Sequence, residues 1–530
     1  MKRALFIFCL LLLVTLLYYG CGSTNQEEAT TTTTASTTTS TTIPIWTEPA
    51  FASATADIIY GQAPLTVNFS GYAFEYQNFQ QQAIGADAYA WDFKDGGTSS
   101  GQNPAHTFTS AGTYLVELTV TVDGATGTDL APVVVYDTQK TFVSGEVSAD
   151  TTWNSSGSPY ILTGDFLTIA SGKTLTISQN AVVVIDSAGL AVNGNLNAQG
   201  ARGQEVIILS KLSTGEEGAG TKINLASTSS ADLDYVKSYD ALFELNSSSF
   251  SANNCNFYDS PLSFMNNISS ITLTDNVFEH RKRGDKPAIM ISSSNNNTIE
   301  DSILRSNAIG ISISQSSGFL VNNCTINDNL CHNGIILDLT DAEVDNSVFN
   351  NNYPHAVLIK GHEADPNDAS YAHEAYIHNN TMYYNHADTV NFEYYYGKSD
   401  FSTRVSSNEI GYDRGGDGVL VEYEAYHGNI IIEHNNIHHN GLEATTGHLD
   451  GITIENAGGV IIRNNTISSN NYNGINLNHG LSITIEANTI SDNGQKGIIL
   501  STNSEAWAKN NTLTSNTIEV DSGSTLHQDY

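Results

Sequence analysis

A repeat with a period of about 23 residues in the second half of the chain limits the folds that are open to it. From residue 254 onward each copy has Asn, two residues, an apolar residue, two residues and a second Asn, followed by a short gap and a Gly-Ile-x-Ile or Gly-Ile-x-Leu segment. Clear copies are 323–329, 464–470 and 510–516, and Gly-Ile segments are 334–337, 451–454, 474–477 and 497–500. A constant period of this length is typical of a solenoid, in which each copy packs only on its two neighbours.

The period predicts three short strands per copy, wound into a right-handed parallel β-helix. Parallel turns stack about 4.8 Å apart, and alternate apolar side chains of each strand fill the interior. The closing Asn of each copy would then form a column of stacked amides that bond to one another and to the turn backbone. The members of this column are Asn307, Asn329, Asn352, Asn385, Asn440, Asn470, Asn493 and Asn516, with Asp413 in place of one. We interpret the column as structural.

The cysteines of the chain do not indicate a disulfide framework or a metal site. Cys255 and Cys324 lie at the same phase of the repeat, several turns apart, and two further cysteines lie in the N-terminal leader. Because no Cys-x-x-Cys pair is present, neither a disulfide framework nor a thiolate zinc site is expected. We predict that Cys255 and Cys324 are small buried residues.

Residues 153–210 alternate as strands do but lack the Asn pattern. Segments 175–178, 182–185 and 190–196 resemble the opening turns of bacterial β-helix proteins, which differ from inner turns because they cap an open apolar end. Residues 138–530 as a whole resemble the pectate-lyase-like β-helix superfamily with its PbH1 repeats. That resemblance implies an all-β fold and favours action on polysaccharides, although motifs of the polygalacturonase or pectate lyase families are not recognisable and fold does not fix function.

A smaller domain precedes the repeat at residues 51–137. Residues 65–69 and 114–120 have the period-two pattern of strands. The segments Trp91-Asp-Phe-Lys-Asp-Gly96, Asn103-Pro-Ala-His-Thr-Phe108 and Gly112-Thr-Tyr114 resemble the PKD domain, an immunoglobulin-like β-sandwich. In this interpretation Trp91 and Phe93 belong to the core, and Asp95-Gly96 forms a turn. PKD domains are usually spacers or weak binding modules, so no catalysis is assigned here.

The N-terminus has the features of an export signal. Two basic residues precede an apolar run over residues 4–17, which is the pattern of a secretory signal. Tyr18-Tyr-Gly-Cys21 then resembles a bacterial lipoprotein processing site, which implies a signal peptide at 1–21 and lipidation of Cys21, although Tyr18 replaces the usual Leu. The Thr-rich residues 22–50 predict a flexible linker. We therefore expect a monomeric, membrane-anchored lipoprotein at the outer membrane or cell surface.

The charge of the chain excludes one class of partner. The formal net charge is −35, from 56 acidic and 21 basic residues. Nucleic-acid binding requires clustered Lys and Arg, so it is not expected. An acidic chain is compatible with an exported protein that uses calcium, because hard cations prefer oxygen ligands.

Function is expected where the repeat lengthens, because insertions in a solenoid become loops on one face. The sequence numbers of successive members of the Asn column differ by 22 and 23 up to Asn352, then by 33, 28, 27 and 30, and by 23 again after Asn470. Loops on both sides of one strand stack would form the walls of a groove. Eleven of the 15 His lie within 355–479, and 11 of the 25 Tyr lie within 353–426.

Aligning the lengthened turns stacks three acidic strands. The segments 388–393, 417–422 and 450–455 each begin with Asp and end with Glu, and alternation turns each Glu outward. The candidate catalytic residues are Glu393, Glu422, Glu455, Asp388, Asp417, Asp450, His386, His448 and Lys360. The candidate substrate-binding residues are Tyr394, Tyr395, Tyr423, Asn391, Asn478, His479 and Arg414. Stacked glutamates repel unless they are protonated, screened or bridged by a cation, so Glu393, Glu422 and Glu455 are also candidate calcium ligands.

These residues predict a polysaccharide-active enzyme, a glycoside hydrolase or a lyase. Neighbouring turns give roughly the carboxylate separation of retaining glycosidases, and alternate turns approach that of inverting ones. Exposed tyrosines offer flat faces for sugar rings. Two alternatives are open: a non-catalytic glycan-binding adhesin or surface scaffold, and a periplasmic protein similar to NosD, which shares the Asn-rich repeat.

Overall fold

The computed structural model describes most of the chain from residue 50 to residue 529. The segments outside the description are 1–49, 78–79, 188, 212–221, 247–248, 266–269, 280–286, 330–331, 362–373, 394–401, 423–428, 444–448 and 530. The predicted signal peptide, Cys21 and nearly all of the linker therefore lie outside the described residues. Within the described part, strands predominate, and no helix is long and apolar enough to cross a membrane.

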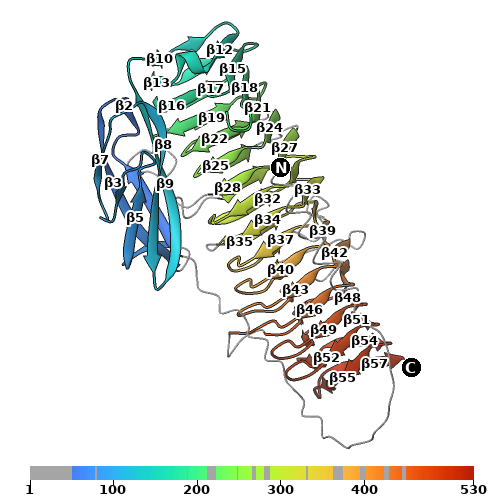
Figure 1. Cartoon of the computed structure of the whole chain (residues 1–530). Helices are drawn as coiled ribbons and strands as arrows, with labels where there is room; N and C mark the ends of the chain where they lie inside the picture. Colours follow the sequence, from blue (N-terminus) through green and yellow to red (C-terminus); the bar gives the residue numbers. More distant parts are fainter. Residues whose placement is uncertain are drawn as a thin grey trace, which may run out of the picture. The chain divides into compact units, whose positions relative to one another are not determined.

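The smaller domain is a sandwich of two sheets (Figure 1). One sheet contains β1 (Phe51–Ala56), β3 (Leu65–Gln77), β4 (Gln80–Ile84) and β7 (Ala105–Phe108). The other contains β2 (Tyr60–Gln62), β9 (Ala125–Tyr136), β8 (Gly112–Val122), β5 (Ala88–Asp92) and β6 (Thr98–Ser99), in that order. The two strands predicted from period-two alternation are confirmed as β3 and β8.

The sandwich core confirms the assignments made from the sequence. Trp91 and Phe93 are buried, and both rings pack against Phe69 at centroid distances of 5.4 and 5.5 Å. Gly96 has φ of +94°, a conformation that L side chains rarely adopt, so a glycine is required at this turn.

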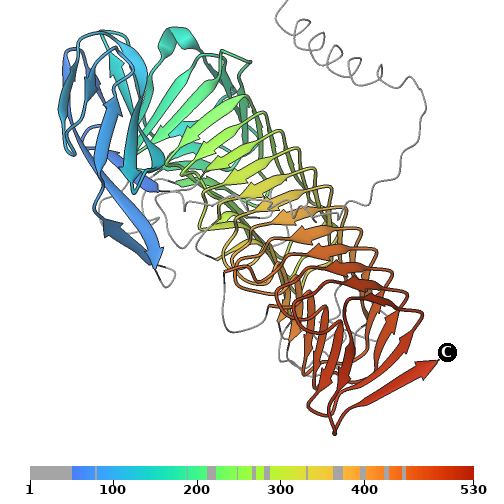
Figure 2. The same cartoon turned by 60° about the horizontal axis from the view of Figure 1, so that its bottom comes forward.

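The rest of the described chain winds as a parallel β-helix (Figure 2). Every third strand pairs in parallel, which produces three sheets of 16 strands each. Sheet 1 runs from β10 (Thr141–Val143) to β55 (Thr512–Thr514), sheet 2 from β11 (Glu146–Val147) to β56 (Ile518–Val520), and sheet 3 from β12 (Thr151–Trp153) to β57 (Thr525–Asp529). The predicted fold class is confirmed.

One apolar core extends through the described turns of the β-helix. Alternate residues of each strand point inward, as Ile452 and Ile454 do in β47 (Ile452–Glu455), and both are fully buried. Cys255 and Cys324 belong to this core, as predicted, and neither of the two is in a disulfide. Burial raises the pKa of each thiol to about 12, so both are un-ionised and chemically inert at neutral pH.

Two columns of asparagine amides hold the turns in register. The predicted column is confirmed: Asn470 Nδ2, for example, donates to Asn493 Oδ1 at 2.9 Å. A second column, which the sequence analysis did not separate, contains Asn380, Asn408, Asn435, Asn465, Asn488 and Asn511. Asn465 Nδ2 donates to Asn488 Oδ1 at 3.0 Å and to the Ile432 carbonyl at 2.8 Å. In the turns that carry these columns, the side-chain amides thus provide partners for buried backbone carbonyls such as those of Val405 and Ile432.

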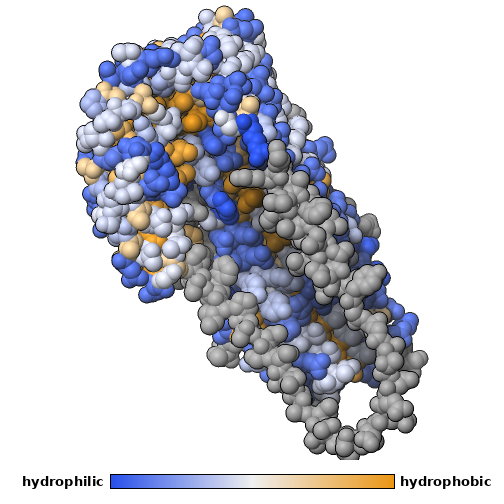
Figure 3. All heavy atoms as spheres, viewed as in Figure 1, coloured by the Kyte–Doolittle hydropathy of each residue, from blue (hydrophilic) through white to orange (hydrophobic). Residues whose placement is uncertain are grey.

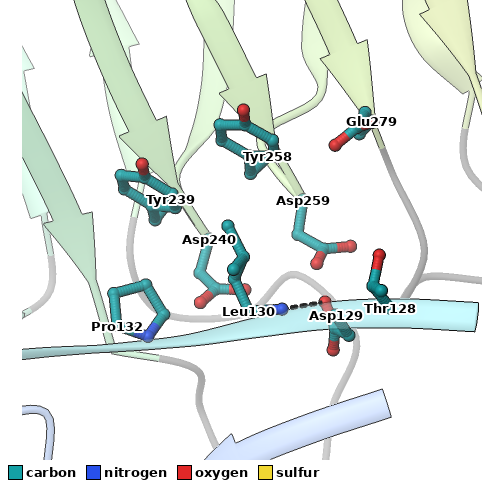
Figure 4. Close-up of a pocket in the computed structure, with 9 residues that line it drawn as sticks. All are labelled: Thr128, Asp129, Leu130, Pro132, Tyr239, Asp240, Tyr258, Asp259 and Glu279. Atoms are coloured by element: carbon teal, nitrogen blue, oxygen red, sulfur yellow. Dashed lines mark hydrogen bonds between the residues drawn. The ribbon is translucent and has the colours of Figure 1, made fainter. Parts of the chain in front are cut away.

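The sandwich contacts the opening turns of the β-helix. Tyr60 Oη donates to Asp186 Oδ2 at 2.7 Å, and Val134 of β9 belongs to an apolar cluster with Ile161 and Val184. Figure 4 shows a pocket beside this contact, with acidic side chains from both sides; its lining residues are Thr128, Asp129, Leu130, Pro132, Tyr239, Asp240, Tyr258, Asp259 and Glu279. The face turned toward the viewer in Figure 3 is predominantly hydrophilic, in keeping with the acidic composition.

The amide columns predict a selective loss of stability. Asn435→Ala removes the donor to Asn465 and to the Val405 carbonyl, and it leaves buried partners unsatisfied. We expect the free energy of unfolding to fall by about 2–4 kcal/mol. Asn464→Gly is the control. Asn464 directly precedes the column residue Asn465, but it is exposed and has φ of +55°, so we expect a change below about 0.5 kcal/mol. Guanidinium denaturation measures both, and equal losses would contradict the structural role of the column.

Candidate active site on the second sheet

In the sequence, the inserted segments of all four lengthened turns directly follow or precede a strand of sheet 2. The relevant strands of this sheet are β38 (Val357–Lys360), β41 (Val390–Glu393), β44 (Val419–Glu422), β47 (Ile452–Glu455) and β50 (Ile475–Asn478). Extra residues follow β38, β41 and β44 and precede β47. The prediction of insertions on both sides of one strand stack is therefore confirmed. Most of the inserted residues lie outside the described part of the chain.

The predicted glutamate column is present. In the pairing of these strands, Lys360 is the register partner of Glu393, Glu393 of Glu422, and Glu422 of Glu455. Asn478 follows Glu455. Since strands of a sheet lie about 4.8 Å apart, the three glutamate backbones succeed one another at that interval.

Neighbouring polar groups hold each of the three glutamates. Lys360 Nζ lies 3.1 Å from Glu393 Oε2, and Asn478 Nδ2 donates to Glu455 Oε1 at 3.2 Å. Glu422 accepts a hydrogen bond from Asn391. Burial raises the pKa of Glu422 against this hydrogen bond, and neighbouring carboxylates raise it further. Glu422 is thus the member of the column best suited to carry a proton.

The three carboxylates do not converge on one point. Among the described residues, their ligand oxygens do not all lie within 4.8 Å of one another. A calcium ion bound by all three would require these side chains to turn toward one another. Calcium at this column stays a prediction.

A second acidic column lies where the chain enters sheet 2. The side-chain oxygen of Asp388 accepts the backbone N–H of Asp417 at 2.9 Å, and Asp417 accepts that of Asp450 at 2.6 Å. Asp450 in turn accepts the backbone N–H of Asn473 at 2.6 Å. Each carboxylate therefore supports the backbone of the next turn.

Asparagine performs the same structural task in turns of ordinary length. Asn333 Oδ1 accepts the backbone N–H of His355 at 3.2 Å, and Asn473 Oδ1 accepts that of Lys496 at 3.1 Å. A neutral amide thus suffices for the hydrogen bond along the column. The chain nevertheless carries an aspartate at this position in three consecutive turns, and these turns are lengthened ones.

Burial makes the three aspartates electrostatically costly. Asp388, Asp417 and Asp450 are 8%, 0% and 2% exposed. Burial raises the pKa of Asp417 well above its ordinary range, and the charges of the two neighbouring aspartates add to this shift. The pKa of Asp450 is also raised, chiefly by burial. The column is therefore suited to hold protons near neutral pH.

A row of polar side chains connects the two acidic columns. Asn391, Thr453 and Asn476 point outward by strand alternation, yet Asn391 and Thr453 are buried. Thr453 Oγ1 and Asn476 Nδ2 donate to Asp450 Oδ2 at 3.2 and 2.8 Å. The second carboxylate oxygen of Asp450 therefore lies on the outer face that also carries the glutamates.

His355 is a member of this site that the sequence analysis did not single out. Its ring is buried, with Nδ1 2.7 Å from the Asp388 carbonyl and Nε2 3.4 Å from Asn391 Nδ2. This pattern makes Nδ1 the donor, and burial lowers the pKa of the ring, so His355 is neutral. His355 occupies the column position directly before Asp388. Aligning one more turn upstream would have found it.

Asp413 replaces asparagine in the first amide column at the same level. It is fully buried, accepts a hydrogen bond from Thr389 Oγ1, and has its pKa raised well above the ordinary range by burial. In the described structure, Asp413 Oδ1 and Asn385 Nδ2 have no hydrogen-bond partner. The amide column is thus interrupted beside the acidic site.

Other predicted residues have partners outside the glutamate column. His386 Nε2 lies 2.9 Å from Asn351 Oδ1, and burial lowers the pKa of this ring to about 4. Arg414 is buried in the turn before sheet 2, and its Nε lies 3.8 Å from Glu443. His479 Nδ1 lies 3.0 Å from the Thr502 carbonyl. The predicted residues outside the described part of the chain are Tyr394, Tyr395, Tyr423 and His448.

Aromatic residues also gather on the turns between sheets 1 and 2. Tyr384 stacks on Tyr412 at a centroid distance of 5.4 Å, and Tyr412 stacks on His439 at 5.0 Å. His438 Nε2 lies 2.6 Å from Glu409 Oε1. Part of the enrichment in His and Tyr is thus explained by rings that stack on one another along the axis of the β-helix. The stacked faces of these rings are already in contact with protein.

Family models agree with this architecture. A model described as a right-handed β-helix region matches residues 240–368 and 367–528, more than half of the chain. The chain belongs to the right-handed β-helix family. A PKD domain model matches residues 59–135, which confirms that resemblance. No curated protein matches the chain.

The chain is similar to several solved structures at low identity and low TM-score. The catalytic domain of Agl-KA is 13% identical over 91% of this chain and 87% of that chain, with a TM-score of 0.38. The catalytic unit of an α-1,3-glucanase from Streptomyces thermodiastaticus is 13% identical over 87% and 88%, with a TM-score of 0.36. The periplasmic alginate epimerase AlgG is 12% identical over 68% and 77%, with a TM-score of 0.29. These values do not indicate a shared active site.

The buried aspartates predict a pH-dependent effect of Asp417→Asn. A raised folded pKa means that stability is lost as pH rises from the unfolded value of about 3.9 through the folded value. We expect the Asn variant to lack the part of this decline that Asp417 causes, while Asp413 and Asp450 keep theirs, and to exceed the wild type by about 1–3 kcal/mol at pH 8. Denaturation from pH 4 to 8 measures the difference. A variant that is less stable than the wild type at pH 8 would show that the charge itself supports the fold.

Proposed function

We propose that the protein is a surface-anchored enzyme that cleaves a polysaccharide, as a glycoside hydrolase or lyase, on the outer face of sheet 2 between β38 and β50. The observation that carries the proposal is the aspartate column. Asp388, Asp417 and Asp450 stand in three consecutive lengthened turns where a neutral amide would serve the fold. Burying three carboxyl groups costs folding free energy. Carboxyl groups with raised pKa values beside a column of glutamates are suited to proton transfer.

The contacts suggest different tasks for neighbouring glutamates. Glu422, whose pKa is raised, is assigned as the acid that protonates the leaving oxygen. Glu393, in its ion pair with Lys360, is assigned as the anionic partner facing the sugar. Adjacent strands support the separation of roughly 5 Å that retaining hydrolysis requires. In the lyase alternative, Lys360 would neutralise a uronate carboxylate while a carboxylate or His355 removes the proton.

Glu422→Gln tests the assignment. We expect it to lower the rate of cleavage by at least about 10³-fold, because the amide cannot donate the proton. Activity is measured on a polysaccharide panel, with and without calcium, by new reducing ends and by the ultraviolet absorbance of unsaturated products. Absorbing products indicate a lyase, and reducing ends alone indicate a hydrolase.

Glu244→Gln is the matched control for this experiment. Glu244 lies in β23 (Leu242–Asn246) of the same sheet and pairs with Lys222 at 2.8 Å, but its turn is outside the lengthened region. We expect its activity to equal that of the wild type. Glycan binding without any product over the panel would contradict the enzyme and favour the adhesin alternative.

The anchor is a separate part of the proposal. Cys21 after the apolar run supports lipidation, and the Thr-rich linker would hold the folded domains away from the membrane. We expect labelled palmitate to be incorporated by the wild type and not by Cys21→Ala, with the variant released into the soluble fraction. Labelling of the variant at the wild-type level would contradict the anchor.

A further inference from the structure

A histidine and two carboxylates meet on the outer face of sheet 3, away from the acidic columns of sheet 2. Asp345 is the last residue of β36 (Ala342–Asp345), and its register partner in the next turn is His378, the last residue of β39 (Ala375–His378). Glu343 lies two residues before Asp345 and therefore on the same face of the strand. The first lengthened turn separates the two strands in the sequence.

The three side chains approach closely. His378 Nε2 lies 2.8 Å from Glu343 Oε1, and His378 Nδ1 lies 3.0 Å from Asp345 Oδ1. One ligand atom from each residue lies within 4.8 Å of the other two. In the described part of the chain this is the only group of three or more such side chains with that spacing.

The surroundings fix two of the three ligands. The His378 ring stacks on Tyr376 at a centroid distance of 4.0 Å, and its side chain is only 12% exposed. Asn346 Nδ2 donates to Asp345 Oδ2 at 2.6 Å, and Asn379 Nδ2 donates to Asp345 Oδ1 at 2.9 Å. Hydrogen bonds of this kind orient the ligands of metal sites.

In a neutral ring of His378 whose Nε2–H donates to Glu343, the lone pair of Nδ1 lies 3.0 Å from Asp345 Oδ1. A neutral imidazole has one N–H, so it can donate to only one of the two carboxylates. In addition, Asn379 Nδ2, which is a donor, lies 2.9 Å from His378 Nδ1 and favours a lone pair there. A divalent cation would relieve this repulsion between the lone pair and Asp345, because it accepts a lone pair from the imidazole and offsets the negative charge of both carboxylates.

We propose that Glu343, Asp345 and His378 bind a first-row divalent transition-metal ion, with Zn²⁺ as the probe. One imidazole nitrogen and two carboxylate oxygens are ligands that Zn²⁺ accepts at about 2.0–2.2 Å, with a water in the fourth position. Calcium fits less well, since it prefers six to eight oxygen ligands. The half-exposed Glu343 side chain can adjust to complete the geometry.

The ion would clamp the β-helix where its repeat is first interrupted. It joins β36 to β39, whose register partners Asp345 and His378 lie on either side of the first insertion. The chain between them is longer than the chain between Asn322 and Asp345, the register partners of the preceding pair. A cross-link over a longer connection restricts the unfolded chain more strongly. The proposal does not depend on the enzymatic assignment of sheet 2.

The chain offers a matched control on the same sheet. His527 Nε2 lies 3.0 Å from Glu505 Oε1, and the His527 ring stacks on Trp507 at a centroid distance of 4.8 Å. This arrangement repeats the aromatic partner and one carboxylate of the His378 group, and the described residues supply no second carboxylate there. His527→Ala should therefore leave the zinc site intact.

The test is zinc binding by the full-length protein, purified without a polyhistidine tag. Competition with a chromophoric chelator gives affinity and stoichiometry, and Co²⁺ substitution reports imidazole and carboxylate ligation through its visible absorbance. We expect one tight site in the wild type and in His527→Ala. We expect affinity at that site to fall at least about 100-fold in His378→Ala and in the isosteric Asp345→Asn, with the melting temperature raised by Zn²⁺ only where the site is intact.

Two results would overturn the proposal. One is a wild-type affinity for Zn²⁺ in His378→Ala, and the other is an equal loss in His527→Ala and His378→Ala, which would indicate only scattered surface binding. Asp345→Asn keeps the shape of the side chain and the Asn346 and Asn379 neighbours, so circular dichroism of this variant separates loss of the ligand from loss of the fold. Loss of zinc binding with an unchanged spectrum supports the site.

Discussion

The hydrogen bonds between stacked side-chain amides are the constraint on which the rest of this molecule depends. In the turns that carry the Asn columns, the column amides and the carbonyls that they bond are buried, and buried polar groups without partners are costly. Asn465 meets this need by donating to the next amide and to a carbonyl, and the same pattern repeats through two columns. Where the columns run, most amides bond to the amide of the next turn, so side chains at equivalent positions of successive turns are held in line. The glutamate column exists because of this alignment.

The candidate site is a local departure from that rule. Where Asn333 and Asn473 carry neutral amides, Asp388, Asp417 and Asp450 carry carboxyl groups at the same positions. Burial raises the pKa of Asp417, and the charges of Asp388 and Asp450 raise it further. An aspartate at this position can therefore take up and release a proton, which an asparagine cannot do.

The alignment of the site was predictable, and its internal contacts were not. Counting residues between repeats placed Lys360, Glu393, Glu422, Glu455 and Asn478 in one column, and the strand register is the one expected. The bond from Asn391 to Glu422 and the buried position of His355 depend on side-chain rotamers and on the packing of neighbouring turns. His386 shows the converse. Its place two residues before Asp388 suggested a catalytic base, but its ring pairs with Asn351.

The sequence by itself determined the fold, because a constant short period with alternating apolar positions permits little other than a stack of three-stranded turns. It also determined which turns depart from the period, and it placed tryptophan and phenylalanine in the core of the sandwich. Only the tertiary structure decided the environment of each charge. The sequence does not show whether a carboxyl group is buried or exposed. In the structure Asp417 is fully buried, and burial raises its pKa well above that of an exposed carboxyl group. Likewise Glu343, Asp345 and His378 share no sequence motif, since they meet only when two turns are stacked across an insertion.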